Sequence, residues 1–183
     1  MKINYVTGNK NKLRFANLMM NKFGIEVEQR ELDVHEIQGE NYLEISTMKA
    51  EEAFAKLQEP LFITDTSWEI PALGGFPGPY MKSISKWFRT EDWLSLMKVK
   101  SDRTIKAIDI IVYIDKDITK VFTANLNCEF ATEPVSGFDD YSIIHRLVKC
   151  EGRFICEYTS NGEGLPNESK AWEEFAGFLK SKN

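Results

Sequence analysis

Residues 7–12, with the sequence TGNKNK, follow a short apolar run at residues 3–6 and open a helical pattern. Backbone N–H groups at a helix start attract phosphate, and Lys12, one turn into the helix, can neutralise a phosphate charge. The segment matches neither a Walker A loop nor a GxGxxG dinucleotide fingerprint. It therefore indicates either a phosphate-binding turn or an ordinary strand-to-helix connection that carries a surface lysine.

Two carboxylates stand near the ends of two other expected strands. Asp65 ends the strand expected at residues 61–64, and Glu36 follows the strand expected at residues 25–32. Ligands gather at the strand ends of α/β sheets, and a divalent cation on a polyphosphate needs one or two carboxylates beside phosphate oxygens and water. The pair could hold such a cation. The alternative is a solvated glutamate and a helix-capping aspartate.

A third feature is the segment ALGGFPGPY at residues 72–80, which holds three glycines and two prolines between bulky residues. Glycine permits close backbone approach, and proline stiffens the chain. The pattern favours one ordered loop over a plain turn. His35 and His145 belong to no Ser-His-Asp arrangement, and we interpret them as a loop residue and a packed residue.

Composition excludes several classes of protein. The chain has 183 residues, 43% apolar and 28% charged, which is ordinary globular usage, and its net charge of −5 disfavours nucleic-acid binding. Its three cysteines contain no C-x-x-C pair, so we expect reduced thiols in a cytoplasmic protein. The first residues become charged too early for a signal peptide, and the apolar runs are too short to span a membrane.

The elements that must position these residues alternate along the chain. The order favours a single α/β domain over residues 1–183, with a central mixed sheet and helices on its faces. The patterns predict strands at residues 3–6, 25–32 and 61–64, helices at residues 10–23, 42–57, 83–97 (broken near 89–90) and 168–179, and a long β-hairpin over residues 103–130 that turns at 115–117.

The order of these motifs resembles that of the inosine and xanthosine triphosphate pyrophosphatase family, which removes noncanonical purine nucleotides. The likeness extends over residues 1–134, and ALGGFPGPY is its most specific segment. The other matching segments are TGNKNK at residues 7–12, EIQ at 36–38, EI and KA at the two ends of residues 44–50, and FITDT at 62–66.

The resemblance implies a Mg²⁺-dependent enzyme that cleaves a nucleoside triphosphate between its α and β phosphates. By position, Glu36 would help to hold the metal, and Asp65 would act as the base or as a second metal ligand near the attacking water. Lys12 would bind the triphosphate and assist catalysis. The resemblance also implies a strongly twisted sheet, two lobes around a nucleotide cleft, a homodimer, and a substrate like ITP, XTP or dITP. The residues that would contact the substrate are Thr7, Gly8, Asn9, Lys12, Thr66, Gly75, Phe138 and Asp139.

The chain departs from the family's pattern at four places. In the helix of the opening motif, Phe15 stands near the place of the family's usual glutamate. Thr64 stands where the family has a glutamate, SGFDD at residues 136–140 replaces FG(Y/W)DP, and the late KxxxSHR segment has no counterpart. Phe138 could still stack on the base, and Asp139 could replace the motif's aspartate. These differences predict weaker base discrimination than the family's. They also keep a second possibility open, a nucleotide-binding or regulatory protein on the same fold with little or no turnover.

Overall fold

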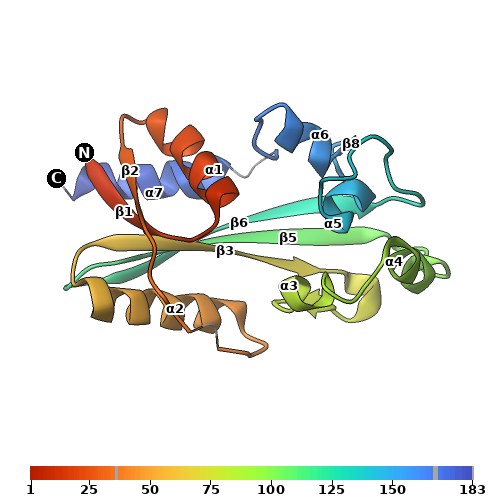
Figure 1. Ribbon diagram of the computed structural model, residues 1–183, viewed down its shortest axis with the longest axis horizontal. Coiled ribbons are helices and arrows are strands. Elements are labelled where there is room, and N and C mark those ends of the chain that lie inside the picture. Colours follow the sequence, from red (N-terminus) through yellow and green to blue (C-terminus); the bar gives the residue numbers. More distant parts are fainter. Residues whose placement is uncertain (36, 167–168, 183) are drawn as a thin grey trace. The chain divides into compact units, whose positions relative to one another are not determined.

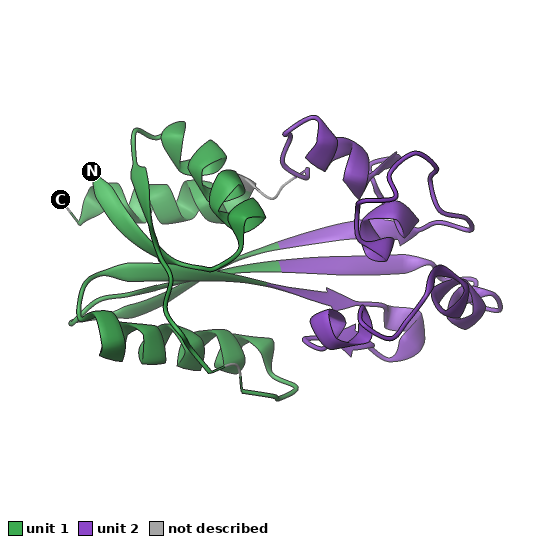
Figure 2. Ribbon diagram, in the orientation of Figure 1, with its two compact units in different colours: residues 1–65, 109–124, 169–183 green, residues 66–108, 125–168 purple. Residues whose placement is uncertain are grey.

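The computed structural model describes residues 1–35, 37–166 and 169–182 (Figure 1). The chain divides into two compact units (Figure 2). Unit 1 comprises residues 1–65, 109–124 and 169–183, and unit 2 comprises residues 66–108 and 125–168. Each unit has its own hydrophobic core. Within the described ranges, no helix is long and apolar enough to cross a membrane.

The described strands form a mixed sheet in the order β2-β1-β3-β5-β6-β7-β8, with β4 beside β3. Strand β1 pairs in parallel with β2 and β3, whereas β4 on β3, β7 on β6 and β8 on β7 are antiparallel. The predicted mixed α/β sheet is therefore confirmed. The strands are β1 (Lys2–Val6), β2 (Glu26–Arg30), β3 (Leu61–Glu69), β4 (Pro77–Gly78), β5 (Thr104–Ile114), β6 (Thr119–Phe130), β7 (Val148–Cys150) and β8 (Arg153–Phe154).

Helices cover both faces of the strands in unit 1, with α1 and α7 on one face and α2 on the other (Figure 2). The alternation of side chains along β3 explains this arrangement. Phe62 stacks on Tyr5 at 4.4 Å and meets Trp172 of α7 edge-on, while Leu61 and Ile63 point to the opposite face. The helices are α1 (Lys10–Asn21), α2 (Tyr42–Leu57), η1 (Pro71–Leu73), α3 (Met81–Ile84), α4 (Thr90–Met97), α5 (Ile143–Leu147), α6 (Ile155–Ser160) and α7 (Ser169–Ser181).

The long hairpin of β5 and β6 turns where the sequence predicts it. The Asp115 carboxylate accepts the backbone N–H groups of Asp117 and Ile118, each at 2.9 Å, and Tyr113 donates its hydroxyl to the same carboxylate at 2.7 Å. A side chain that binds backbone groups two and three residues ahead stabilises a tight turn. The DKD break therefore closes the hairpin as expected.

Arg103 connects two elements of unit 2 through its guanidinium group. Arg103 donates hydrogen bonds to the backbone carbonyls of Met97, Phe130 and Ala131 at 3.1, 2.6 and 2.7 Å. A guanidinium presents several donors in a fixed fork, so one side chain can satisfy three carbonyl groups. Arg103 thus joins the end of α4 to the end of β6.

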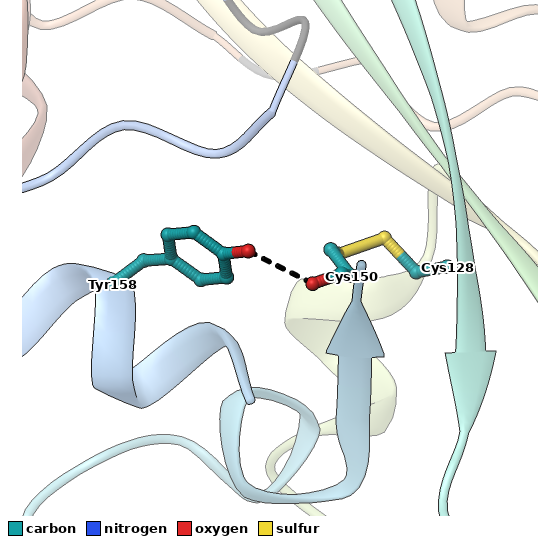
Figure 3. Close-up of a disulfide and its surroundings, with 3 residues drawn as sticks. All are labelled: Cys128, Cys150 and Tyr158. Atoms are coloured by element: carbon teal, nitrogen blue, oxygen red, sulfur yellow. Dashed lines mark hydrogen bonds between the residues drawn. A yellow bond between two sulfur atoms is a disulfide. The ribbon is translucent and has the colours of Figure 1, made fainter. Parts of the chain in front are cut away.

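The expectation of three reduced thiols is wrong in this structure. Cys128 and Cys150 form a disulfide (Figure 3). Cys156 is a buried free thiol. The ladder pairs Glu129 with Lys149, which places the two bonded cysteines directly opposite each other on β6 and β7, with Cα atoms 4.4 Å apart. The sequence hides this bond because a pairing across an irregular segment leaves no periodic pattern.

Candidate functional site

The segment at residues 7–12 forms the turn from β1 into α1. Asn9 is the N-cap residue, and its Oδ1 accepts the backbone N–H groups of Asn11 and Lys12 at 2.9 and 3.2 Å. Thr7 Oγ1 accepts the N–H of Asn9 at 3.1 Å. The cap therefore occupies two of the N–H groups that a phosphate could use, and a phosphate that took them would displace the Asn9 amide.

Gly8 is not required by the backbone of this turn. Its φ lies outside the left-handed region, and a Cβ built on it would meet no atom within 4 Å. A residue with a side chain could therefore adopt the backbone conformation of this turn. Open space beside an exposed backbone next to Lys12 is instead what close approach of a ligand would need.

We expect the Gly8→Ala variant to fold normally. Its KM for a nucleoside triphosphate should rise about tenfold, because a Cβ would keep phosphate oxygens from the backbone. Thermal melting and steady-state kinetics test this. Gly24→Ala is the matched control, since Gly24 has φ +71° at the end of α1. That variant should lower the Tm and leave KM unchanged. A Gly8→Ala enzyme with wild-type KM would remove Gly8 from the substrate site.

Lys12 reaches from α1 to β3. Its Nζ donates to the backbone carbonyl of Thr64 at 2.9 Å and lies 3.7 Å from Asp65 Oδ1. Both charged side chains are about one-third exposed, at 34% and 35%. The structure thus brings together, within unit 1, a lysine and a carboxylate that the sequence placed on separate elements.

Asp65 does not end its strand as predicted. Strand β3 continues to Glu69, because residues 66–70 keep a β-rich pattern with Trp68 and Ile70 buried. The ladder of β3 with β1 contains Leu61 and Phe62, so Asp65 lies beyond this parallel pairing. Its carboxylate is therefore at the carboxyl end of the β1–β3 pair, the position where ligands collect in α/β sheets.

Thr64, which stands where the resembled family has an acid, is bound to the core of unit 1. Its Oγ1 lies 2.5 Å from the hydroxyl of Tyr5. Burial raises the pKa of Tyr5 to about 12, against the opposing effect of its hydrogen bonds to Thr64 and Thr7, so the phenol is neutral at physiological pH. The sequence did not single out this pair, because neither residue type announces a buried hydroxyl contact.

Glu36 lies outside the described residues, but the residue before it is tied to α2. The Glu52 carboxylate accepts the backbone N–H of His35 and contacts His35 Nδ1, both at 3.0 Å. Lys56 donates to Glu52 at 2.7 Å and to the carbonyl of Asp33. His35 is therefore a loop residue, as expected. Across the described ranges, no cluster of three or more His, Cys, Asp or Glu side chains could hold a metal ion.

The glycine-rich segment belongs to unit 2 and is the ordered loop that was predicted. Ile70 donates its N–H to Phe76 O and accepts the N–H of Gly75, both at 3.1 Å. Gly74 and Gly75 have φ +67° and +92°, a region that favours glycine. Thr66, the other predicted contact in this part of the chain, lies within β3.

Phe138 and Asp139 also lie in unit 2. The half-buried ring of Phe138 meets the ring of Tyr141 edge-on, with ring centroids 5.6 Å apart. The exposed carboxylate of Asp139 forms an ion pair with the Arg146 guanidinium, with 2.9 Å between Oδ1 and Nη2. Arg146 was not predicted as a site residue, because its contact with Asp139 crosses an irregular loop. Burial lowers the pKa of His145, which fits the packed residue expected from sequence.

Comparison with known proteins decides the family. The model of the Ham1 family matches residues 3–142, a range that includes every predicted site residue from Thr7 to Asp139. The chain belongs to the Ham1 family. Among relatives of this Ham1-family chain, a dITP/XTP pyrophosphatase of Methanopyrus kandleri is 32% identical over 135 residues, 73% of this chain and 72% of that protein. Another, from Thermococcus kodakarensis, is 28% identical over 185 residues and 98% of each chain.

Solved structures agree with this assignment at the level of the fold. The Ham1 protein of Staphylococcus aureus superposes with a TM-score of 0.78 over 100% of both chains, at 19% sequence identity. In this Ham1-family protein, unit 1 presents an ammonium group, a carboxylate and a helix start, which suit phosphate and a hard cation. Unit 2 presents a pair of rings beside a carboxylate and a guanidinium, which suit a flat polar ring.

Proposed function

We propose that this Ham1-family chain hydrolyses noncanonical purine nucleoside triphosphates to the monophosphate and pyrophosphate. The observation that carries the proposal is the position of Lys12 beside Asp65 at the carboxyl end of the β1–β3 pair. The relatives are named for action on dITP and XTP. A lysine and a carboxylate near a helix start supply the positioning and charge that phosphoryl chemistry uses.

In this proposal, the residues of unit 1 exchange partners when substrate binds. Lys12 donates to Thr64 O and pairs with Asp65 in the absence of ligand. A triphosphate carries more negative charge than one carboxylate, so it draws the ammonium group away from Asp65. The Asp65 carboxylate then accepts a proton from the attacking water, while Thr7 and the Gly8 backbone hold phosphate oxygens.

The metal in this proposal is Mg²⁺. Asp65 suits Mg²⁺ as a ligand, because a partly exposed carboxylate is the group that a protein usually contributes when phosphate oxygens supply the other ligands. Glu36 is proposed as the second carboxylate ligand. When bound, the cation withdraws charge from the phosphate oxygens. We also propose that the protein acts in the cytoplasm as a homodimer, on small nucleotides and not on nucleic acid.

The base is proposed to stack on Phe138, and this predicts modest base selectivity. Phe138→Ala should lower kcat/KM about tenfold for inosine, xanthosine, adenosine and guanosine triphosphates alike, because stacking is tolerant of base identity. Trp87→Ala is the matched control, since Trp87 is an aromatic residue of the same unit that is 71% exposed. Strong preference for hypoxanthine or xanthine together with a silent Phe138→Ala would show that other residues read the base.

The products distinguish this proposal from its alternatives. Phosphorus NMR of ITP incubated with the enzyme and Mg²⁺ should show the monophosphate and pyrophosphate growing together. Release of inosine diphosphate and orthophosphate would mean attack at a different phosphorus atom. Nucleotide binding without any product would support the second possibility, a binding or regulatory protein on the same fold.

A further inference from the structure

Phe138 and Asp139 lie at the tip of a hairpin-like arm, which we define as residues 128–150 of unit 2. The arm leaves from the end of β6 and returns through α5 and β7. Backbone hydrogen bonds join the outgoing side of the arm to the returning side as far as Val135 and Arg146. The tip is the segment between these two residues. The contacts between the sides are Glu129 with Lys149 and Phe130 with Val148 in the ladder, then Ala131 N to Leu147 O at 2.7 Å and Val135 N to Arg146 O at 3.0 Å.

The Cys128–Cys150 disulfide closes this arm at its base. Figure 3 shows the bond joining β6 to β7, with the hydroxyl of Tyr158 directed at the Cys150 carbonyl. That hydroxyl donates to Cys150 O at 2.9 Å, so α6 also anchors the returning strand. The two cysteines have a sequence separation of 22. The segment between them contains Phe138, Asp139 and the Arg146 that pairs with Asp139.

We propose that the Cys128–Cys150 disulfide is a positioning bond for the base-binding tip of the arm, so that nucleotide affinity depends on the oxidation state of this cysteine pair. The effect on affinity rests on the proposed function of Phe138. The mechanism is indirect, because neither sulfur has to touch the nucleotide. The bond closes the base of the arm, so without it the two sides of the arm separate at a lower free-energy cost. An arm whose sides have separated does not hold its tip in one conformation.

The redox step is thiol–disulfide exchange with a small dithiol or glutathione-type thiol. The reductant supplies two electrons and two protons, the S–S bond breaks, Cys128 and Cys150 become thiols, and the reductant becomes a disulfide. Oxidised glutathione reverses the step by taking back the same electrons and protons. Cys128 is 7% exposed and Cys150 is 0% exposed, so exchange requires local opening of the arm and should be slow.

Cys156 provides a matched control within the same unit. It is a buried free thiol, and burial raises the pKa of its thiol, so it is a poor nucleophile for exchange. Cys156→Ala should therefore keep the full redox response. The double variant Cys128→Ala/Cys150→Ala should behave like the reduced enzyme and should not respond to dithiothreitol.

The first measurement counts thiols and follows melting. After treatment with oxidised glutathione, the unfolded chain should react with one equivalent of a thiol reagent, and after dithiothreitol with three. Reduction should lower the Tm by roughly 10 °C, from the loop-closure entropy of a ring of this length. A chain that still shows three thiols after oxidation, or a Tm that reduction does not move, overturns the proposal.

The second measurement tests positioning itself. Reduction should raise the KM for ITP about three- to tenfold with little change in kcat, because fewer molecules hold the tip ready for binding.

Chymotrypsin should also cleave after Phe138 or Tyr141 faster in the reduced protein, a readout that does not depend on activity. Equal cleavage in both states would overturn the positioning role. Faster cleavage in a protein that hydrolyses no nucleotide would support the bond and contradict only the proposed function. If the double variant does not fold, reduced wild type supplies the same comparison.

Discussion

Replacing Asp65 with asparagine is expected to lower kcat by about 10²- to 10⁴-fold, the range for loss of a positioned base. Asparagine keeps the volume of the side chain but cannot accept the proton of the attacking water or hold a cation as a carboxylate does. The Tm should change little, because Lys12 keeps its bond to the Thr64 carbonyl. The measurement is kcat at saturating ITP beside a melting curve.

The control for this variant is Asp115→Asn, also in unit 1. Asp115 receives two backbone N–H groups, the Tyr113 hydroxyl and the Lys182 ammonium at the hairpin turn. Its neutralisation should lower the Tm by a few degrees and leave kcat close to wild type. If Asp65→Asn instead turned over every accepted nucleotide at the wild-type rate, Asp65 would not be the base.

Replacing Lys12 with methionine is expected to weaken binding of a non-hydrolysable triphosphate by roughly 10- to 150-fold, the cost of one hydrogen bond to a charged group. The Tm should also fall by about 2–4 °C, because the bond from Lys12 Nζ to Thr64 O is lost. Calorimetric titration and thermal melting measure the two effects.

Lys10→Met is the matched control for this variant. Lys10 is an exposed lysine on the same first turn of α1, and within the described part of the chain its side chain makes no hydrogen bond to β3. It should change affinity far less than Lys12→Met. Equal losses from both variants would mean that general positive charge, and not the placement of Lys12, attracts the triphosphate.

The sequence was most informative where an element is long enough for its period to be visible. Helix α2 occupies the predicted residues, capped by Asn41 through Leu43 and Glu44 N–H groups, and the β5–β6 hairpin turns at Asp115. Side chains on one face of a helix or strand recur at a fixed spacing, so burial leaves a signal that a single sequence can carry. The turn at residues 7–12 was located for a similar reason, since it lies between two such elements.

The sequence was least informative between residues 140 and 165. Helices α5 and α6 and strands β7 and β8 have two to six residues each, too few for a period to be distinguished. Contacts that these elements make with earlier residues, such as Arg146 with Asp139 and Cys150 with Cys128, depend on the tertiary path of the chain. The hydrogen bond from Lys12 to the Thr64 carbonyl also depends on the tertiary path, because the two residues are distant in sequence and no motif predicts their contact.

The most direct test of the proposed activity is pyrophosphate release from a panel of nucleoside triphosphates, with Mg²⁺ and with the cation removed by chelation. We expect release from ITP and XTP with Mg²⁺, slower release from ATP and GTP, and none after chelation. An enzyme that melts cooperatively and binds ITP, yet releases no pyrophosphate from any nucleotide with Mg²⁺, would contradict the assignment of hydrolysis to this chain.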